Sequence, residues 1–354
     1  MNSEAASINS TSIAQQSQIT PIKFTGTARE FFGIWIANIL LSVLTLGIYS
    51  AWAKVRTKKY FNTHTIISGA CFDYHAKPLS ILKGRVLGVL LYILYGAVSK
   101  YSLTIALVFL SVIFLSLPWI IVQSMKFNSR NTSYRGVRFN FQGGLAEAYK
   151  IFLLLTLLFI FTLGLIVPYA IFRFYKFSIN NTRYGTASFS TTALPGKFYL
   201  ICLQVLGLFV AFIITMFLIF MAAEKIIDGA STFSLIPFLP FFLIFFVLFV
   251  PNAFVKTKIG NIVYNTTSLE NFRFISTMRV RDMIWIYFSN SVAIIFTFGL
   301  LIPWTKIRLA RYRAEHLVIT GDADFNHFIG QKIEAMSAAG QEIGDMFDVD
   351  IAVI

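Results

Sequence analysis

The stretch TLGIYSAWAKVRTKKY, residues 45–60, changes from apolar to basic within the length of one helix. Similar stretches recur as TLGLIVPYAIFRFYKF at 162–177 and as TFGLLIPWTKIRLARY at 297–312. When the three are aligned on their glycine, a threonine, an aromatic residue and two basic residues coincide. Weaker copies begin at Pro118 and Pro251. Five copies predict internal repeats whose units bury surface against their neighbours.

The composition indicates a membrane protein. Of the 354 residues, 56% are hydrophobic and only 13% are charged, whereas soluble domains carry about 25% charged residues. We predict a mainly α, polytopic integral membrane protein, in which re-entrant helical hairpins or single spans alternate with paired transmembrane helices. The apolar segments lie near 31–53, 86–99, 101–123, 151–172, 198–222, 233–255 and 283–305.

Each repeated stretch is followed by a short β pattern. The clearest is NTSYRGVRFNFQG at 131–143, with a turn at Arg135 and Gly136 and alternating apolar residues after it. A strand-like IKFTG at 22–26 resembles the end of that pattern. Strands with open edges cannot lie in lipid, so we expect them to form a small cytoplasmic sheet or collar.

Acidic residues distinguish hairpins from true spans. One stands 15 positions before each threonine, where a hairpin would return it close to the arginine of the same repeat. A straight helix would separate the two by about 39 Å. We favour hairpins that turn at Thr-x-Gly, with true spans as the alternative. The predicted pairs are Glu30 with Arg56, Glu147 with Arg173, and Asp282 with Arg308.

The aromatic and basic residues of each repeat fall at i, i+4 and i+7, on one helix face. Tryptophan suits the headgroup level of a membrane, and arginine and lysine bind phosphate. We predict a lipid or phosphate site at each copy, with ordinary interfacial anchoring as the alternative. The residues are Trp52, Arg56, Lys59, Trp119, Lys126, Tyr169, Arg173, Lys176, Trp304, Arg308 and Arg311. The copy at Pro251 departs from the pattern, with Asn252, Lys256 and Ile259 in the aligned places.

No motif predicts catalysis, a cofactor or a metal. The first and last repeats carry histidines at the same two positions, but other copies have Asn, Gln or Thr there, which share hydrogen bonding rather than metal ligation. We therefore expect hydrogen-bonded histidines and no enzymatic activity. The histidines are His64, His75, His316 and His327.

The charge distribution predicts topology. From Glu315 onward eight acidic residues stand against one basic residue, giving −7, while the rest of the chain is near +21. We expect the basic ends and both tails to be cytoplasmic. The predicted organisation is a disordered tail at 1–21, a membrane domain at 22–330 and an acidic tail at 331–354. The units of that domain are 22–76, 77–143, 144–193, 194–275 and 276–330.

The stretch FTGTAREFFGIWIANILLSVLTLGIYSAWAKVRTKKYFNTHT at 24–65 and the ending EIGDMFDVDIAVI at 342–354 resemble the YjgN-like family of bacterial inner-membrane proteins, a domain of unknown function. The resemblance implies an inner-membrane location and supplies no active site.

Taken with the residue patterns, the prediction is a non-enzymatic protein whose basic cytoplasmic face binds anionic lipid headgroups or a protein partner. The alternative is a transporter or channel for a small, neutral solute. No nucleic-acid partner is expected, and the sequence leaves the oligomeric state open.

Overall fold

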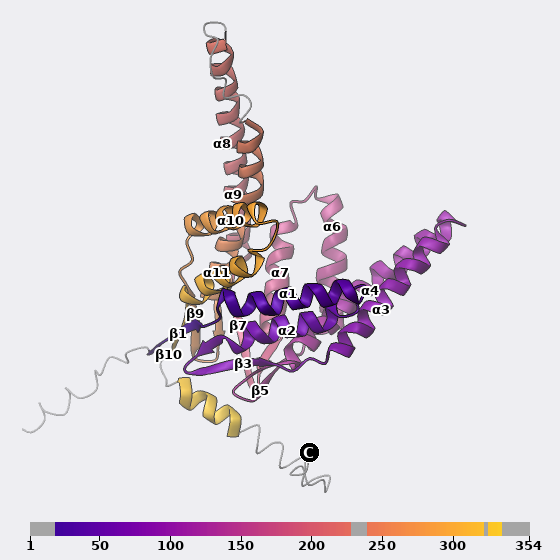
Figure 1. Cartoon of the computed structure of the whole chain (residues 1–354), viewed down its shortest axis with the longest axis vertical. Coiled ribbons are helices and arrows are strands. Elements are labelled where there is room, and N and C mark those ends of the chain that lie inside the picture. The colour runs from indigo at the N-terminus through magenta and orange to yellow at the C-terminus, as the bar shows by residue number, and fades with distance from the viewer. Residues whose placement is uncertain (1–17, 228–238, 322–324, 335–354) are drawn as a thin grey trace, which may run out of the picture.

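The computed structural model describes residues 18–227, 239–321 and 325–334 (Figure 1). Within these ranges ten short strands close into one antiparallel barrel, in the order β1-β10-β9-β8-β7-β6-β5-β4-β3-β2. The strands are β1 (Gln18–Phe24), β2 (Thr65–Ile67), β3 (Ala70–Tyr74), β4 (Thr132–Tyr134), β5 (Val137–Phe141), β6 (Thr182–Tyr184), β7 (Ala187–Thr191), β8 (Thr267–Leu269), β9 (Phe272–Ser276) and β10 (Leu317–Gly321).

A pair of helical arms is inserted between successive β-hairpins, and the strands on either side of each pair hydrogen-bond to each other. The arms are α1 (Ala28–Leu44) with α2 (Ser50–Thr63); α3 (Pro78–Val98) with α4 (Leu103–Arg130); α5 (Leu145–Tyr149), a π-helical turn η1 (Lys150–Leu154) and α6 (Leu155–Phe161) with α7 (Val167–Asn180); α8 (Pro195–Ile227) with α9 (Leu239–Asn265); and α10 (Val280–Phe296) with α11 (Ile302–Glu315).

The predicted fold class is wrong about the sheet and about the spans. The strands form a closed barrel that holds the main core, not a small sheet or collar on a helical bundle. In the part of the chain that the structure describes, three helices are long and apolar enough to cross a membrane: Pro78–Val98, Leu103–Arg130 and Pro195–Ile219. The barrel strands have three to seven residues, fewer than the roughly nine to eleven that a membrane-spanning strand needs.

The apolar segments at 31–53, 151–172 and 283–305 each fold back as a hairpin. In the first, Leu46 has φ 49° and Gly47 has φ 89°. The Gly47 amide donates to the Ser42 carbonyl and the Leu46 amide to that of Val43, which is a Schellman C-cap. The two residues after Thr162 and the two after Thr297 donate the same pair of backbone hydrogen bonds. The predicted hairpins therefore do turn at Thr-x-Gly.

These turns expose apolar side chains while satisfying their own backbone. Every backbone N–H from residue 45 to residue 51 donates to an acceptor within the hairpin. At the same tips Leu46, Leu163 and Phe298 are 95%, 93% and 98% exposed. A segment with this combination can enter lipid without leaving unpaired donors there.

The barrel interior is filled by aromatic residues. Phe72, Phe139, Phe189 and Phe274 follow one another around the barrel with ring centroids 6.2–6.3 Å apart. Tyr184 is among the largest fully buried side chains, and its hydroxyl donates to the Tyr134 carbonyl at 3.0 Å. The alternating F-x-F pattern in the strands thus serves the core.

A helix at 325–334 closes the barrel end that carries the β-hairpin turns. Its Phe325, Phe328 and Ile329 join the barrel core. Its outer residues contact turn residues, with Asn326 Oδ1 2.6 Å from Arg135 Nη2, and Lys332 Nζ 2.8 Å from Glu270 Oε1. The helical hairpins leave from the opposite end (Figure 1).

The chain ends differ from the predicted boundaries. Strand β1 begins at Gln18, inside the expected disordered tail, because it pairs with β10 and with β2. The helix at 325–334 crosses the expected boundary at 330. The predicted disorder of the first tail and the predicted acidic tail at 331–354 fall mainly on residues 1–17 and 335–354, which lie outside the described ranges.

Candidate headgroup site at the helical hairpins

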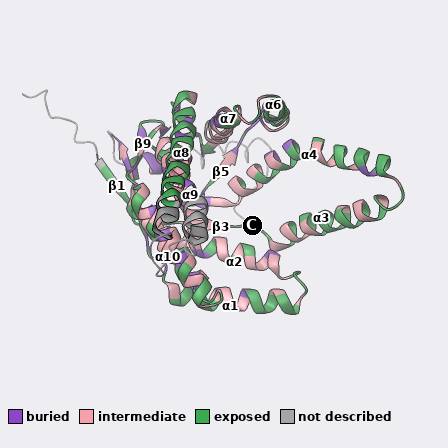
Figure 2. Cartoon of the chain, turned by 90° about the horizontal axis from the view of Figure 1, so that it is seen from above, coloured by how far each residue is buried: buried purple, intermediate pink, exposed green. Residues whose placement is uncertain are grey.

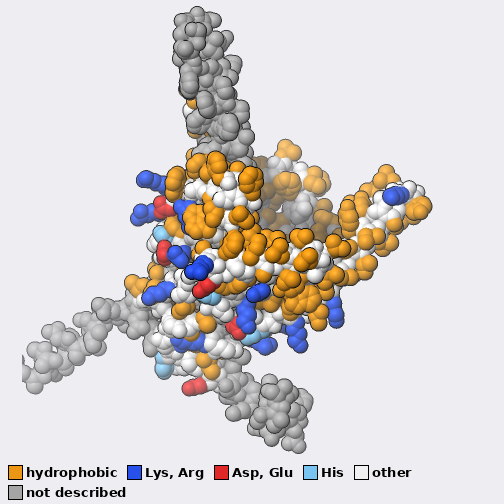
Figure 3. Space-filling model, viewed as in Figure 1, with side chains coloured by type: hydrophobic (Ala, Val, Ile, Leu, Met, Phe, Trp, Pro, Cys, Tyr) orange, Lys and Arg blue, Asp and Glu red, His pale blue; other side chains and the backbone are white. Residues whose placement is uncertain are grey.

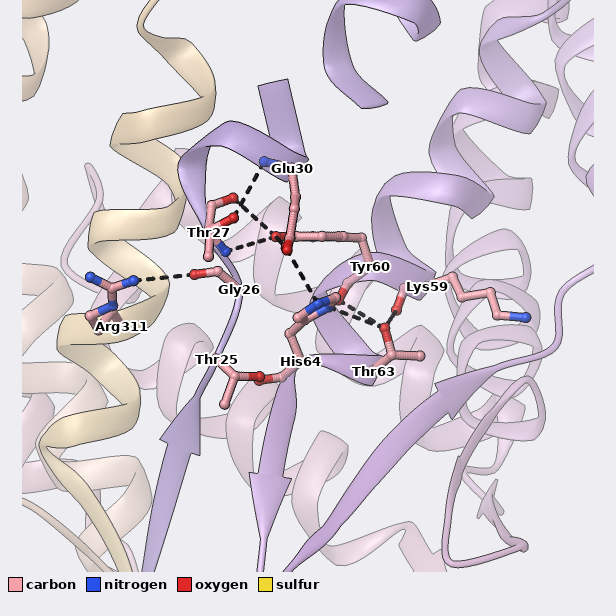
Figure 4. A network of polar contacts seen from close by, with 9 residues as sticks. All are labelled: Thr25, Gly26, Thr27, Glu30, Lys59, Tyr60, Thr63, His64 and Arg311. Atoms are coloured by element: carbon pink, nitrogen blue, oxygen red, sulfur yellow. Dashed lines mark hydrogen bonds and ion pairs between the residues drawn. The ribbon is translucent and has the colours of Figure 1, made fainter. Parts of the chain in front are cut away.

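A tyrosine near the end of α2 holds the two arms of the first hairpin together (Figure 4). The Tyr60 hydroxyl accepts the Thr27 amide N–H at 2.9 Å. Its own hydrogen has two acceptors within reach, the Thr27 carbonyl at 3.0 Å and Glu30 Oε2 at 3.2 Å. His64 lies under the same carboxylate, with Nε2 3.8 Å from Glu30 Oε2 and Nδ1 2.8 Å from the Tyr60 carbonyl. The acid that was expected to pair with Arg56 is therefore held by Tyr60 and His64.

The last hairpin repeats this arrangement. The Tyr312 hydroxyl accepts the Arg279 amide N–H at 2.9 Å and lies 3.3 Å from Asp282 Oδ2. His316 Nδ1 lies 2.8 Å from the Tyr312 carbonyl. Burial, reinforced by the neighbouring carboxylate, raises the pKa of Tyr60 and of Tyr312, so both remain hydroxyl donors at neutral pH.

The middle hairpin holds its acidic residue through an arginine instead of a tyrosine. Phe177 stands where the other two have tyrosine, and it has no hydroxyl to offer the acid. Glu147 instead lies 3.3 Å from Arg173 Nη2. Of the three predicted ion pairs, this is the one that the structure contains.

In the last hairpin the arginine is left available. Arg308 Nη1 donates to Ser289 Oγ at 2.6 Å and to Asn290 Oδ1 at 3.1 Å, and its Cζ lies 5.2 Å from the Trp304 ring centroid. Within the described ranges Arg308 forms no ion pair. Ser289 and Trp285, on the facing helix, were not singled out from the sequence, because only the hairpin places α10 beside α11.

A cavity of about 520 Å³ opens between the start of α1 and the last hairpin. Its polar and aromatic wall includes Trp285, Trp304, Arg308, Arg311 and Glu315. Arg311 Nη2 donates to the Gly26 carbonyl at 3.2 Å, so it also fixes the first hairpin to the last. Figure 3 shows most of the visible Lys and Arg side chains around the bases of the hairpins, and hydrophobic side chains along the coloured arms.

The other predicted residues are spread around the barrel rather than brought together. Arg56, Lys59 and Lys176 are exposed, and Lys126 is half-buried. Trp52 stacks on Tyr49, Trp119 is 49% exposed, and Tyr169 packs beside Phe172. The basic and aromatic residues therefore lie on separate hairpins.

The strands correct the alignment of the copy at Pro251. In the other four copies the aromatic residue precedes the first residue of the following strand by thirteen positions, and β8 begins at Thr267. The equivalent residues are thus Phe254 and Lys258, not Asn252 and Lys256. Lys258 Nζ lies 5.7 Å from the Phe254 ring centroid, as Arg308 lies over Trp304. The aromatic residue is therefore present in all five copies.

Three of the four histidines, His64, His75 and His316, occupy hydrogen-bonded positions, whereas His327 is exposed on the helix at 325–334. His75 Nε2 lies 2.8 Å from Ser133 Oγ, and its Nδ1 lies 3.7 Å from Asp73. No group of three or more potential metal ligands occurs among the described residues. Cys71 and Cys202 are free and exposed.

A family model described as "Bacterial protein of unknown function (DUF898)" matches residues 19–346. This chain belongs to that family. "Inner membrane protein YjgN" of Salmonella typhimurium is 27% identical over 127 residues, which are 36% of this chain and 32% of that protein. The Escherichia coli O157:H7 protein of the same name is 28% identical over 129 residues, covering 33% and 30% respectively.

The chain aligns with about a third of the length of these curated relatives. No solved structure matches. The family, its inner-membrane relatives and the three long apolar helices together identify a bacterial inner-membrane protein. The resemblance that the sequence suggested is confirmed.

Proposed function

We propose that this is a non-enzymatic, multi-pass membrane protein whose basic, cytoplasmic side binds the phosphate of anionic lipid headgroups. The exposed apolar tips enter the lipid, and the aromatic and basic residues at the hairpin bases meet the headgroups. The observation that carries the proposal is Arg308, which lies over Trp304 near the exposed Phe298 tip and forms no ion pair among the described residues.

The two kinds of hairpin differ in their expected affinity. In the first and last hairpins a tyrosine holds the acid, which leaves Arg56 and Arg308 free to bind phosphate. In the middle hairpin Glu147 already neutralises Arg173. Since charge-assisted bonds from arginine to phosphate are among the stronger polar contacts, lipid should concentrate at the first and last hairpins.

The cavity beside Arg308 also contains Glu315 and Asp282. Asp282 is hydrogen-bonded to Tyr312, whereas Glu315 faces the cavity and repels any second negative group. We therefore expect one phosphate per cavity, held between Arg308 and Arg311, rather than a headgroup that carries several phosphates.

Native mass spectrometry of the full chain with phosphatidylglycerol tests the proposal. The double variant Arg56→Gln plus Arg308→Gln should lose most of the retained lipid, while Arg173→Gln, the matched control, should retain it. Phosphatidylethanolamine serves as the zwitterionic comparison and should be retained less. Retention of phosphatidylglycerol by the double variant at the wild-type level would refute the proposal.

A further inference from the structure

A second site lies between the bases of the helical hairpins and the barrel. A cavity of about 690 Å³ lies between the middle hairpin, α9 and the base of α11. A second cavity of about 410 Å³ occupies the mouth of the barrel on the helical side. Both volumes are typical of small-molecule sites. The two cavities share Tyr264, Met278 and Arg313 in their walls, so they adjoin there.

The walls are apolar apart from a few groups. Ile171, Phe174 and Val263 line the larger cavity, and Phe61 and Phe72 line the smaller one. Among the described residues, the charged ones lining the two cavities are Arg313 and Lys256, and none of the lining residues is a carboxylate. Lys256 Nζ lies 5.2 Å from the Tyr287 ring centroid and lines only the larger cavity. Arg313 lines both cavities and therefore lies where they adjoin.

Arg313 is an exception among the repeats. The residues four positions before the strands that follow the other hairpins are Phe61, Asn128, Ser178 and Val263. None is charged, so the repeat itself does not require a cation at this position. Arg313 also forms no ion pair in the described ranges. Its side chain is exposed, which leaves the guanidinium accessible to an anion beside the apolar walls.

We propose that the two adjoining cavities bind an amphiphile with one hydrocarbon chain and an anionic head, with the head at Arg313. The apolar walls accept the chain, and the guanidinium accepts a carboxylate or a phosphate. The barrel core and the helix at 325–334 close the far end, so the pair forms a blind site rather than a passage. The site is distinct from the headgroup contacts on the outer hairpins, and it does not depend on them.

Photolabelling of the full chain tests this site directly. The probes are a stearate that carries a diazirine on its chain and the neutral monoglyceride of the same fatty acid. Labelled peptides from the purified protein are mapped by mass spectrometry. The stearate should label the walls near Ile171 and Val263, and Arg313→Gln should reduce that labelling by about tenfold.

The control is Arg281→Gln, near the start of α10, because this exposed arginine lines none of the three cavities. Its labelling of the inner walls should stay within about twofold of wild type. Arg313→Lys should restore part of the labelling, because it restores the charge without the planar fork. Ile171→Trp should reduce labelling by both probes, since it fills the larger cavity. The thermal unfolding midpoint of each variant shows whether it has folded.

Three results would overturn the proposal: equal inner-wall labelling by the neutral probe, unchanged labelling in a folded Arg313→Gln protein, or labelling confined to the outer hairpin faces. The last result would leave the outer headgroup proposal intact. Conversely, loss of phosphatidylglycerol binding in the Arg56 and Arg308 variants has no bearing on the inner site. The two proposals therefore fail independently.

Discussion

The first and middle hairpins share one architecture but hold their acid in opposite ways. Glu30 is held by the Tyr60 hydroxyl, while Glu147 is paired with Arg173 because Phe177 replaces the tyrosine. The hairpins with the tyrosine thus have an arginine without an ion pair, and the hairpin with phenylalanine has an arginine paired with its acid. The last hairpin follows the first, with Tyr312 holding Asp282.

The difference gives the acidic residues a structural role. Each one joins the two arms of its hairpin close to the barrel. Figure 2 shows the hairpins leaving the barrel in different directions, so each must be fixed at its own base. Substitutions at these bases should therefore change the stability or the lipid binding of the protein.

Removing the hydroxyl from the first hairpin should be the most costly change. Tyr60→Phe leaves the Thr27 amide without its acceptor and Glu30 without a donor, and Tyr60 is only 6% exposed. Unfolding free energy should fall by about 2 kcal/mol, measured as a lower thermal midpoint. Tyr92→Phe, at a side chain that is 77% exposed, is the matched control and should leave the midpoint unchanged. Equal midpoints for the two variants would contradict the role of Tyr60.

Adding the hydroxyl to the middle hairpin should convert it to the other type. In Phe177→Tyr the new hydroxyl can bind Glu147, and this releases Arg173. A double-mutant cycle with Glu147→Gln should give a coupling of about 1 kcal/mol. The variant should also retain more phosphatidylglycerol than wild type by native mass spectrometry. A coupling near zero, with unchanged lipid retention, would show that the hydroxyl does not control Arg173.

Breaking the existing ion pair should have the smallest effect. Glu147 and Arg173 side chains are 43% and 29% exposed, and exposed pairs contribute about 0–1 kcal/mol. Glu147→Gln should therefore lower the unfolding free energy by less than about 1 kcal/mol, and the difference should shrink as salt is added. If Glu147→Gln lowered the unfolding free energy as much as Tyr60→Phe, the ion pair would stabilise its hairpin as strongly as the tyrosine hydroxyl does.

The sequence by itself determined the repeat, the β-hairpin signals, the Thr-x-Gly turns and the family. These are local or periodic features, and a turn such as Arg135-Gly136 is specified by residues that are adjacent in the chain. It also indicated hydrogen-bonded positions for the histidines, because the same two places carry Asn, Gln or Thr in other copies. The structure contains such bonds for His64, His75 and His316.

Only the tertiary structure decided how these pieces are closed and paired. The barrel depends on β1 meeting β10, strands that begin 299 residues apart, and no local pattern encodes such a contact. The partners of Glu30 and Asp282 depend on tyrosines thirty positions away, brought close by the hairpins. The cavities beside Arg313 form where several repeats meet, so their shape depends on packing that no single repeat specifies.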